Sequence, residues 1–279
     1  MAVYQGAMTY HAGQLDPIFA AAVPLNPYWS IVDSAAAVNG RAYRNYDPAR
    51  NVDYIVLVLD NYNYYTTIEF WDDWDAVAHA GVGNSFTNSF TDSSSTLRLT
   101  KRTGDYFLRV LDHSIVWGNM NYGCGYYIGN PTRYTEEYDL PLFVGHSSRT
   151  GTAPAINALG LGVNMSSGSY TANQNMVWQT FRNEYKAVDV IHNDTSRQIT
   201  SITNQVNAGT VALDITGKVR LEEIGIYSYA GRRLLGVLDG VVGARASSDP
   251  FSNGDTVTIG ATTWLAIKRS DYTSFVEMK

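Results

Sequence analysis

The stretch Asp53-Tyr54-Ile55-Val56-Leu57-Val58-Leu59 is a β-branched, apolar run with the length of one strand. A run of this kind predicts a buried strand. The next segment alternates with a period of two, which assigns its residues to the two faces of a second strand. One face would carry Tyr64, Thr66, Ile68 and Phe70, and the other Tyr65, Thr67, Glu69 and Trp71.

Strand signals recur along the rest of the chain. We expect strands over residues 96–101, 106–117 (with a hairpin turn at 111–114), 126–129, 140–144, 211–215, 219–227, 234–242, 255–259, 262–268 and 275–278, the last at a sheet edge. Gly260 and Ala261 form a two-residue loop that suits a type II′ turn. Short helices are expected over 18–23, 30–38 and 196–206, and residues 176–191 mix both signals. The fold is predicted to be mostly β, with sandwich or barrel-like layers and a few short helices.

The composition shifts between Gly145 and Asn175 to Gly, Ser, Thr, Ala and Asn, with a single charge at Arg149. A stretch of this length and composition indicates a boundary or an extended arm. We therefore expect an N-terminal α+β, mainly β domain over 1–148, a flexible arm over 149–175 and a C-terminal β domain over 176–279.

The chain is poor in charge. Its 279 residues include 20 Lys plus Arg and 26 Asp plus Glu, so its formal net charge is −6. This balance supplies no field for binding a phosphate backbone, and we expect no nucleic-acid partner. Charged residues make up 16% of the chain, against about 25% in an ordinary soluble domain. Because interfaces are rich in aromatic residues and poor in Lys, Glu and Asp, much of this Tyr- and Gly-rich surface is expected to face protein.

Motifs for a metal, a nucleotide or a nucleophile are missing from the sequence. The five histidines have no metal-ligand spacing, and we expect them at the surface or the edge of the core: His11, His79, His113, His146 and His192. The single cysteine, Cys124, excludes a disulfide framework and is expected to be buried and inert. No phosphate-binding glycine loop or Gly-x-Ser-x-Gly elbow occurs. We expect no enzyme activity, no catalytic residue, no metal and no cofactor.

One segment could be argued to be catalytic. Residues Glu69-Phe70-Trp71-Asp72-Asp73-Trp74-Asp75 combine four carboxylates with two indoles, after Tyr62, Tyr64 and Tyr65. Glycosidases use two carboxylates across the scissile bond, and aromatic faces stack on sugars. Adjacent Asp72 and Asp73 cannot both point into one cleft from an extended strand. We favour a strand that ends in an Asp-rich turn, with Trp71 and Trp74 covering core or partner; a sugar-binding platform is the alternative.

Neither nucleic acid nor a membrane is indicated by the remaining motifs. Lys101-Arg102 and Arg232-Arg233 are isolated basic pairs, which are typical of solvated faces. The apolar stretch 18–23 is too short for a secretory signal, and no run approaches the length of a membrane span. We expect the chain to be made in the cytosol and to stay soluble, so the glycosylation matches at Asn164 and Asn193 would carry no glycan.

Two patches of the chain carry a further pattern. The first patch comprises Asp112-His113-Ser114-Ile115-Val116-Trp117, residues 126–131 and Tyr138-Asp139-Leu140-Pro141-Leu142-Phe143-Val144-Gly145. The second comprises residues 234–241, Gly254-Asp255-Thr256-Val257-Thr258-Ile259-Gly260, residues 264–267 and residues 275–278. In this order they resemble structural proteins of the tailed-bacteriophage virion, which carry a Tyr-x-x-Pro-Leu-x-Val-Gly-Gly-Ser-like segment and end in a similar hairpin and strand. His146 stands where the second glycine is usual.

The resemblance implies a virion structural protein of the tail or head-tail neck, made in the host cytoplasm, with no enzymatic activity and no cofactor. Its partners would be copies of itself and neighbouring tail, neck or baseplate proteins. A symmetric assembly suits a β-rich chain with few charges, because unpaired edge strands, and the arm over 146–175, can become joints. Two alternatives stay open: a carbohydrate-binding or glycan-degrading module of a tail fibre or spike, and a capsid decoration protein.

Overall fold

The described strands group into two antiparallel sheets, so the chain is mostly β, as predicted. The computed structural model describes residues 3–9, 11–63, 65–86, 96–101, 103–122, 124–134, 141–144, 146–148, 175–179, 184–191, 222–228, 234–245, 251–269 and 272–278. The smaller sheet runs in the order β13 (His146–Ser148), β7 (Thr96–Thr100), β5 (Tyr65–Asp75), β4 (Val52–Leu59), β3 (Gly40–Asp47) and β2 (Trp29–Ala37), and β6 (Ala80–Phe86) pairs with β5.

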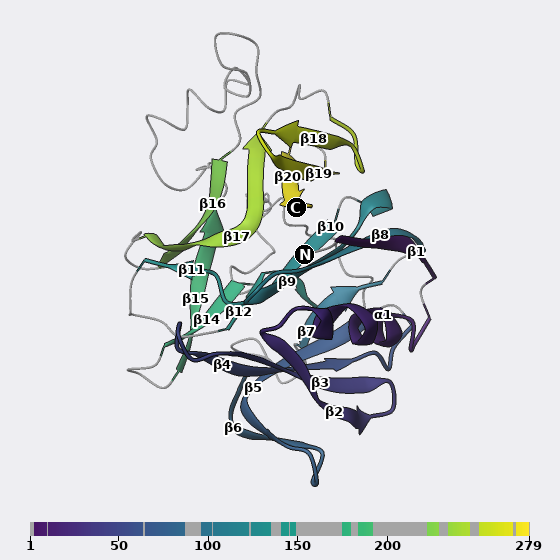
Figure 1. Cartoon of the computed structure of the whole chain (residues 1–279), viewed down its shortest axis with the longest axis vertical. Helices are drawn as coiled ribbons and strands as arrows, with labels where there is room; N and C mark the ends of the chain where they lie inside the picture. The colour runs from purple at the N-terminus through teal and green to yellow at the C-terminus, as the bar shows by residue number, and fades with distance from the viewer. Residues whose placement is uncertain are drawn as a thin grey trace.

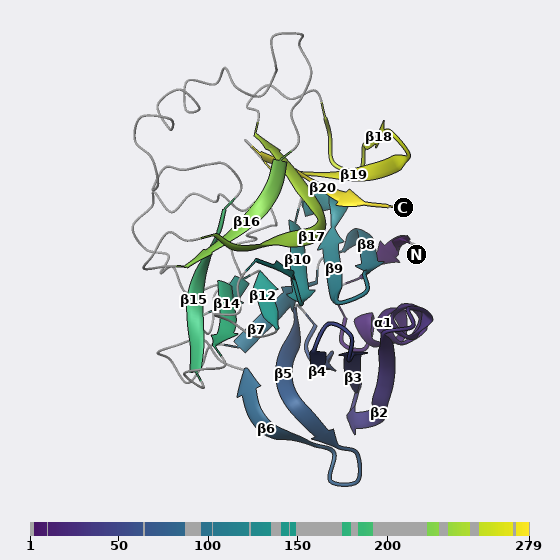
Figure 2. The same ribbon diagram turned by 60° about the vertical axis from the view of Figure 1, so that its left-hand side comes forward.

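The larger sheet contains the remaining strands and curls into a half-barrel. Its order is β1 (Val3–Met8), β8 (Gly104–Val110), β9 (Ser114–Asn119), β10 (Cys124–Gly129), β12 (Leu142–Val144), β14 (Asn175–Gln179), β15 (Glu184–Ile191), β16 (Glu222–Ser228), β17 (Leu234–Arg245), β20 (Tyr272–Glu277), β19 (Thr262–Arg269) and β18 (Thr256–Ile259). Strand β11 (Thr132–Arg133) pairs with β17. Figures 1 and 2 show β17 to β20 lying over β8 to β10, with the smaller sheet on the other side of those strands.

The two strands that the sequence predicts first form the centre of the smaller sheet. Strand β4 is buried on both faces, since Val56 belongs to the cluster between the sheets and Ile55 to a cluster on the outer face. In β5 the predicted alternation is confirmed on one side, where Ile68 and Phe70 are fully buried. Both patterns are local properties of the chain, which is why the sequence could predict them.

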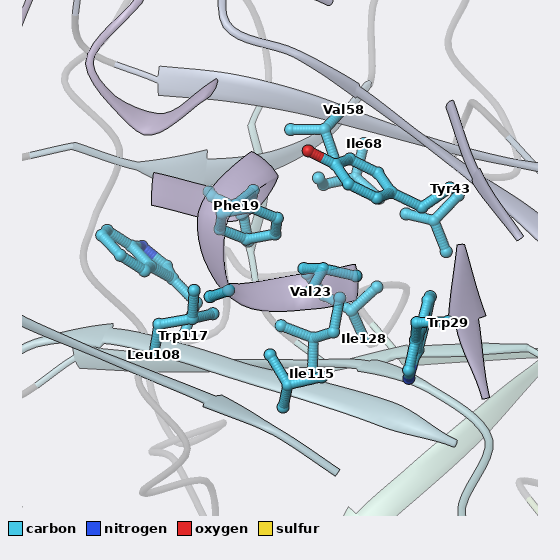
Figure 3. Close-up of a cluster of buried hydrophobic side chains, with 14 of the residues drawn as sticks. Phe19, Val23, Trp29, Tyr43, Val58, Ile68, Leu108, Ile115, Trp117 and Ile128 are labelled. Atoms are coloured by element: carbon cyan, nitrogen blue, oxygen red, sulfur yellow. The ribbon is translucent and has the colours of Figure 1, made fainter. Parts of the chain in front are cut away.

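The main core lies between the sheets and is filled from the N-terminal helical segment. Helix α1 (Leu15–Ala22) is followed by the 3₁₀ turn η1 (Val23–Leu25), which confirms the short helix expected near 18–23, and a second 3₁₀ turn, η2, covers Met120–Tyr122. Figure 3 shows Phe19 and Val23 between the two sheets. The side chains around them come from the larger sheet (Leu108, Ile115, Trp117, Ile128) and the smaller one (Tyr43, Val58, Ile68).

A second core lies inside the half-barrel. Phe107, Val116 and Tyr127 pack there against the C-terminal strands, through Leu235, Leu238, Val241, Leu265, Ile267 and Val276. The strands on either side of the predicted arm also join one sheet, because β12 pairs with β14 through Leu142 and Val177. Residues 149–174 themselves lie outside the described residues, and the domain boundaries stay a prediction.

Residues 30–38 do not form the predicted helix. Residues 30–37 belong to β2 and Val38 to the turn after it; β2 pairs with β3 from Trp29 opposite Asn45 to Ala37 opposite Gly40. The turn between them places Asn39 at a φ of 53°, a left-handed conformation that Asn tolerates better than most residues. The helix propensity of an Ala-rich run is a weak preference, and pairing with a neighbouring strand overrides it.

One prediction for the C-terminal half is wrong. Strand β20 is not an edge strand, because it lies between β17 and β19, and both Phe275 and Val276 are fully buried. Residues 176–191, with mixed signals, contribute β14 and β15. The hairpin of β18 and β19 is confirmed, and Gly260 has the positive φ, 62°, that its turn requires. The strand expected over 211–215 and the helix over 196–206 lie outside the described residues.

Lys101 is buried, which corrects the prediction of a solvated basic pair; Arg102 lies outside the described residues. Its ammonium group donates to the Asp60 carboxylate and to the carbonyl oxygen of His11 (2.9 Å). Asp60 also accepts from the Thr66 hydroxyl (2.8 Å) and from the backbone N–H of Leu15 (2.6 Å), at the start of α1. Burial lowers the pKa of Lys101, and Asp60 opposes that shift.

Removal of the Asp60 carboxylate is expected to destabilise the fold strongly. In Asp60→Ala, Lys101 would stay buried without its counter-ion, and breaking a buried pair costs about 3–5 kcal/mol. The measurement is the free energy of unfolding in urea, followed by circular dichroism. Asp53→Ala is the control, because Asp53 pairs with Arg44 (2.6 Å) while 42% of its side chain is exposed, and such pairs contribute about 0–1 kcal/mol. Equal losses in the two variants would contradict this role of Asp60.

Candidate functional site

The carboxylate and tryptophan segment of β5 lies on the outer face of the smaller sheet, where β5 and β6 leave the sheet as a two-stranded hairpin (Figure 2). Glu69 and Trp71 sit opposite Leu57 and Ile55 of β4. The Trp71 indole N–H donates to the Glu69 carboxylate (3.2 Å), and partial burial raises the pKa of Glu69. Glu69 is thus a partly desolvated carboxylate beside an aromatic ring.

The three aspartates of the segment serve different local contacts. A β-bulge between Trp71 and Asp73 breaks the alternation at Asp72. Asp72 lies against Gly83 of β6, whereas Asp73 lies 4.0 Å from the Arg44 guanidinium on β3. Asp75 accepts from the N–H groups of Val77 (2.8 Å) and Ala78 (2.9 Å), and these bonds lower its pKa.

The predicted Asp-rich turn is therefore present at Asp75, although β5 itself extends through this residue. The structure also gives Asp72 and Asp73 separate surroundings, as expected for neighbours on a strand. The described carboxylates of this segment do not converge as a pair.

Both tryptophans pack on the protein. Trp71 and Trp74 cover the buried side chains of Ala42, Ile55 and Leu57 on the outer face of the sheet. A Cβ atom at Gly81 would come within 2.0 Å of Trp71 Cδ2, so the indole lies flat on the backbone of β6. The interpretation that these rings cover core is confirmed, and removing either one would disturb the hairpin itself.

Asp33 of β2 holds the hairpin in place. Its carboxylate is buried and accepts from the Trp74 indole N–H (2.9 Å) and from the backbone N–H of Ala35 (2.8 Å). His79 Nδ1 lies 2.8 Å from the same carboxylate, across the turn of the hairpin. Burial alone would raise the pKa of Asp33, but the bonds from His79, Trp74 and Ala35 outweigh it, so this pKa is lowered.

The sequence analysis missed Asp33. One signal could have found it, since Asp33 is the only charged residue between Trp29 and Val38. A lone charge in an apolar and Ala-rich stretch indicates a specific partner, because burying an unpaired carboxylate is costly. The partners lie 41 and 46 residues away, however, and no local pattern identifies them.

The tyrosines before β5 form the remaining part of the predicted cluster. The rings of Tyr62 and Tyr65 stack with centroids 4.4 Å apart and an interplanar angle of 21°. Tyr62 is 50% exposed. Tyr64 lies outside the described residues. An accessible aromatic face is therefore present at Tyr62, whereas the two indoles are committed to packing.

His113 lies in a second polar cluster, which the sequence analysis did not predict. It occupies the β8–β9 turn, which is confirmed at residues 111–114, and only 5% of it is exposed. Its ring nitrogens face Asp47 (3.2 Å) and Asn45 (3.2 Å), both of β3. Burial and then Arg50 lower the pKa of His113, while Asp47, Asp112 and Asp239 oppose the shift. With both nitrogens occupied, this histidine joins the two sheets.

The other single residues of interest give no converging site within the described residues. His11 and His79 are exposed. The side chains of His146 and Cys124, and residue His192, lie outside the described part of the chain, as do Arg232-Arg233, Asn164 and Asn193. No group of three or more His, Cys, Asp or Glu side chains that the structure describes could hold a metal ion. No described helix is long and apolar enough to span a bilayer.

No protein-family model matches the sequence, and no curated protein matches it either.

Replacing Asp33 with Asn is expected to weaken the hairpin in a pH-dependent way. Hydrogen bonds to a charged group contribute about 1.5–3 kcal/mol, so Asp33→Asn should lower the free energy of unfolding by an amount of that order at pH 7. Because the folded chain lowers the pKa of Asp33, its contribution is complete above the ordinary value of 3.8 and is lost as the pH falls through the folded value. The difference between wild type and variant should therefore shrink below pH 3.8.

The matched control is Asp73→Asn, since 61% of the Asp73 side chain is exposed. Its free energy of unfolding should stay close to that of the wild type at each pH. A difference for Asp33→Asn that is constant with pH would contradict the ionic role of Asp33. Hydrogen exchange of the β5–β6 amides gives a second, local measurement of the same effect.

Proposed function

We propose that the chain is a structural protein of a tailed-bacteriophage virion, which assembles as a symmetric ring or layer in the tail or head-tail neck. It would contact copies of itself and neighbouring tail, neck or baseplate proteins, and it would reach the virion after synthesis in the host cytoplasm. No catalytic residue or cofactor is assigned in this proposal.

The contact between the two patches that resemble virion proteins is the observation that carries the proposal. Val116 and Tyr127 belong to the first patch, and Leu235, Leu265 and Val276 belong to the second. All of them share the buried cluster inside the half-barrel. The two patches therefore build one core and belong to a single folded unit, as the proposal requires of them.

The surface supports the same proposal. Aliphatic side chains stand at or beside the turns of three hairpins: Val38 (81% exposed), Val77 (93%) and Ile259 (49%). Turns usually carry polar residues and glycine. Single exposed apolar groups are common on protein surfaces, so they support the proposal only together with the low charge of the chain, which is typical of interfaces.

The location of the chain in purified particles tests this proposal. We expect mass spectrometry to find the chain in particles of the phage that encodes it, and immunogold labelling to place it in the tail or neck. Labelling over the capsid surface would instead favour the decoration protein. Absence of the chain from purified particles would contradict a virion role of any kind.

A carbohydrate-binding module of a tail fibre or spike is a second candidate, and the exposed stack of Tyr62 on Tyr65 favours it. Tyr62→Ala should then weaken glycan binding about 2–10-fold, because an aromatic stack contributes about 0.5–1.5 kcal/mol. Glycan-array binding followed by titration is the measurement. Tyr46→Ala is the matched control, since Tyr46 is also 50% exposed. A wild-type chain that binds no glycan would remove this candidate.

A further inference from the structure

We propose that copies of the chain join through the two ends of the larger sheet, with β18 of one copy added to β1 of the next. This inference rests on the proposed assembly function and names its joint. Strands β1 and β18 end the strand order, and no described strand pairs with the outer side of either. In both views they lie on the same side of the half-barrel (Figures 1 and 2).

The outer side of β18 presents backbone groups toward which no described strand lies. In antiparallel strands, successive residues bond to opposite neighbours. The N–H of Ala266 donates to the carbonyl oxygen of Asp255 (2.8 Å). Because every second residue bonds to the same neighbour, Val257 and Ile259 also bond to β19. The residues between them, Thr256 and Thr258, therefore direct their N–H and C=O groups away from the sheet.

Strand β1 also directs backbone groups away from the sheet. The β8–β9 turn closes with Leu111 N–H donating to the carbonyl oxygen of Ser114 (2.8 Å). Residues of β8 bond alternately to β9 and to β1. Starting from the Leu111 bond to β9, this alternation makes Leu108 and Tyr106 bond to β1, where their partners are Tyr4 and Gly6. Gln5 and Ala7 consequently direct their backbone groups outward. Each end of the sheet thus offers at least two residues whose donors and acceptors can pair with another strand.

The ends of the smaller sheet carry features that discourage strand addition. Strand β2 contains two register shifts and the inward-pointing charge of Asp33. Strand β6 contains Gly83 at a φ of 83° and a bulge in its pairing with β5, and β13 is only three residues long. Bulges, inward charges and short strands are the usual means by which sheet edges avoid pairing with another chain.

Strands β1 and β18 carry neither a charge nor a bulge within their described pairings. Their sequences are Val-Tyr-Gln-Gly-Ala-Met and Thr-Val-Thr-Ile, without a charge or a proline. Their described pairings with β8 and β19 contain no register shift. Before β18, Gly254 and Asp255 both bond to Ala266, which is a bulge, so the regular edge comprises Thr256–Ile259. The contrast with the smaller sheet favours these two ends as sites of addition.

A joint between two different edges suits a ring. Pairing of β18 with a second β18 would use one edge and stop at a dimer. Pairing of β18 with β1 leaves one free edge of each kind on every growing assembly, and such contacts close into rings when the rotation between copies allows it. Neither strand carries a charge, so no like charges oppose each other across the joint.

Proline substitutions at the outward-facing positions test the joint. Thr258→Pro and Gln5→Pro each remove an N–H that no described residue accepts from, and edge strands tolerate proline there. Thr258→Val and Gln5→Thr are matched controls that keep the N–H. The readout is the mass in solution by size-exclusion chromatography with light scattering. The wild type and both controls should form oligomers, and the two proline variants should not.

Mixing the proline variants distinguishes the possible joints. Each variant alone should have the mass of a single chain, 30.8 kDa, and their mixture should form only a 1:1 pair, because one free edge of each kind remains. Loss of assembly in Thr258→Pro with none in Gln5→Pro would indicate β18 with β18 and overturn the proposal. A monomeric wild type, or oligomers that survive both substitutions, would overturn it too.

Melting temperatures separate unfolding of the chain from loss of the joint. Melting temperatures of each proline variant and its control show whether the fold is kept; if it is not, Thr258→Lys and Gln5→Lys replace the prolines, since edge lysines also block addition. Failure of the joint differs from failure of the proposed function, because a chain found in the tail by labelling could still assemble through another surface.

Discussion

The carboxylate of Asp60 holds together segments that would otherwise have no fixed relation. It accepts from Lys101 after β7, from Thr66 in β5 and from the first turn of α1, and all three donors are buried with it. Helix α1 begins without a side-chain cap of its own, so Asp60 supplies the acceptor that its free N–H groups need. Through this contact the helix is oriented so that Phe19 fills the space between the sheets.

A second set of polar contacts fixes the larger sheet on the smaller one. Side chains of β2, β3 and β4 donate hydrogen bonds to three carbonyl oxygens of the β8–β9 turn. Trp29 Nε1 donates to Leu111 (3.0 Å) and Asn45 donates to Asp112 (2.8 Å). The Tyr54 hydroxyl donates to His113 (2.7 Å). A turn normally satisfies its carbonyl groups with water. Here protein donors replace the water, so the turn can be buried and both faces of β8 to β10 can carry core residues.

The sequence predicted the features that depend on neighbouring residues, and it failed where distant ones decide. Strand β4 and the alternation of β5 follow from local patterns, and the β18–β19 turn follows from Gly260. The helix expected over 30–38 was wrong because strand pairing outweighs the propensity of alanine. Lys101 was misplaced because its partner Asp60 lies 41 residues earlier, and β20 because strand order does not follow chain order. In the candidate site, the packing of Trp71 and Trp74 was anticipated, whereas the carboxylate of Asp33 was not.

Some of the few charged residues of the chain lie inside the fold and not on its surface. Asp33, Asp60, Lys101 and Arg109 are all buried, so part of the small set of charged residues is used inside the fold. Arg109 illustrates the cost, since its Nε and Nη1 atoms have no hydrogen-bond partner among the described residues, and burial lowers its pKa against the opposing effect of Glu277 and Asp112. Charges placed inside cannot protect the sheet edges outside. Lysine or proline on β1 and β18 would oppose strand addition there, and the absence of both from these two strands is the feature on which the proposed joint depends.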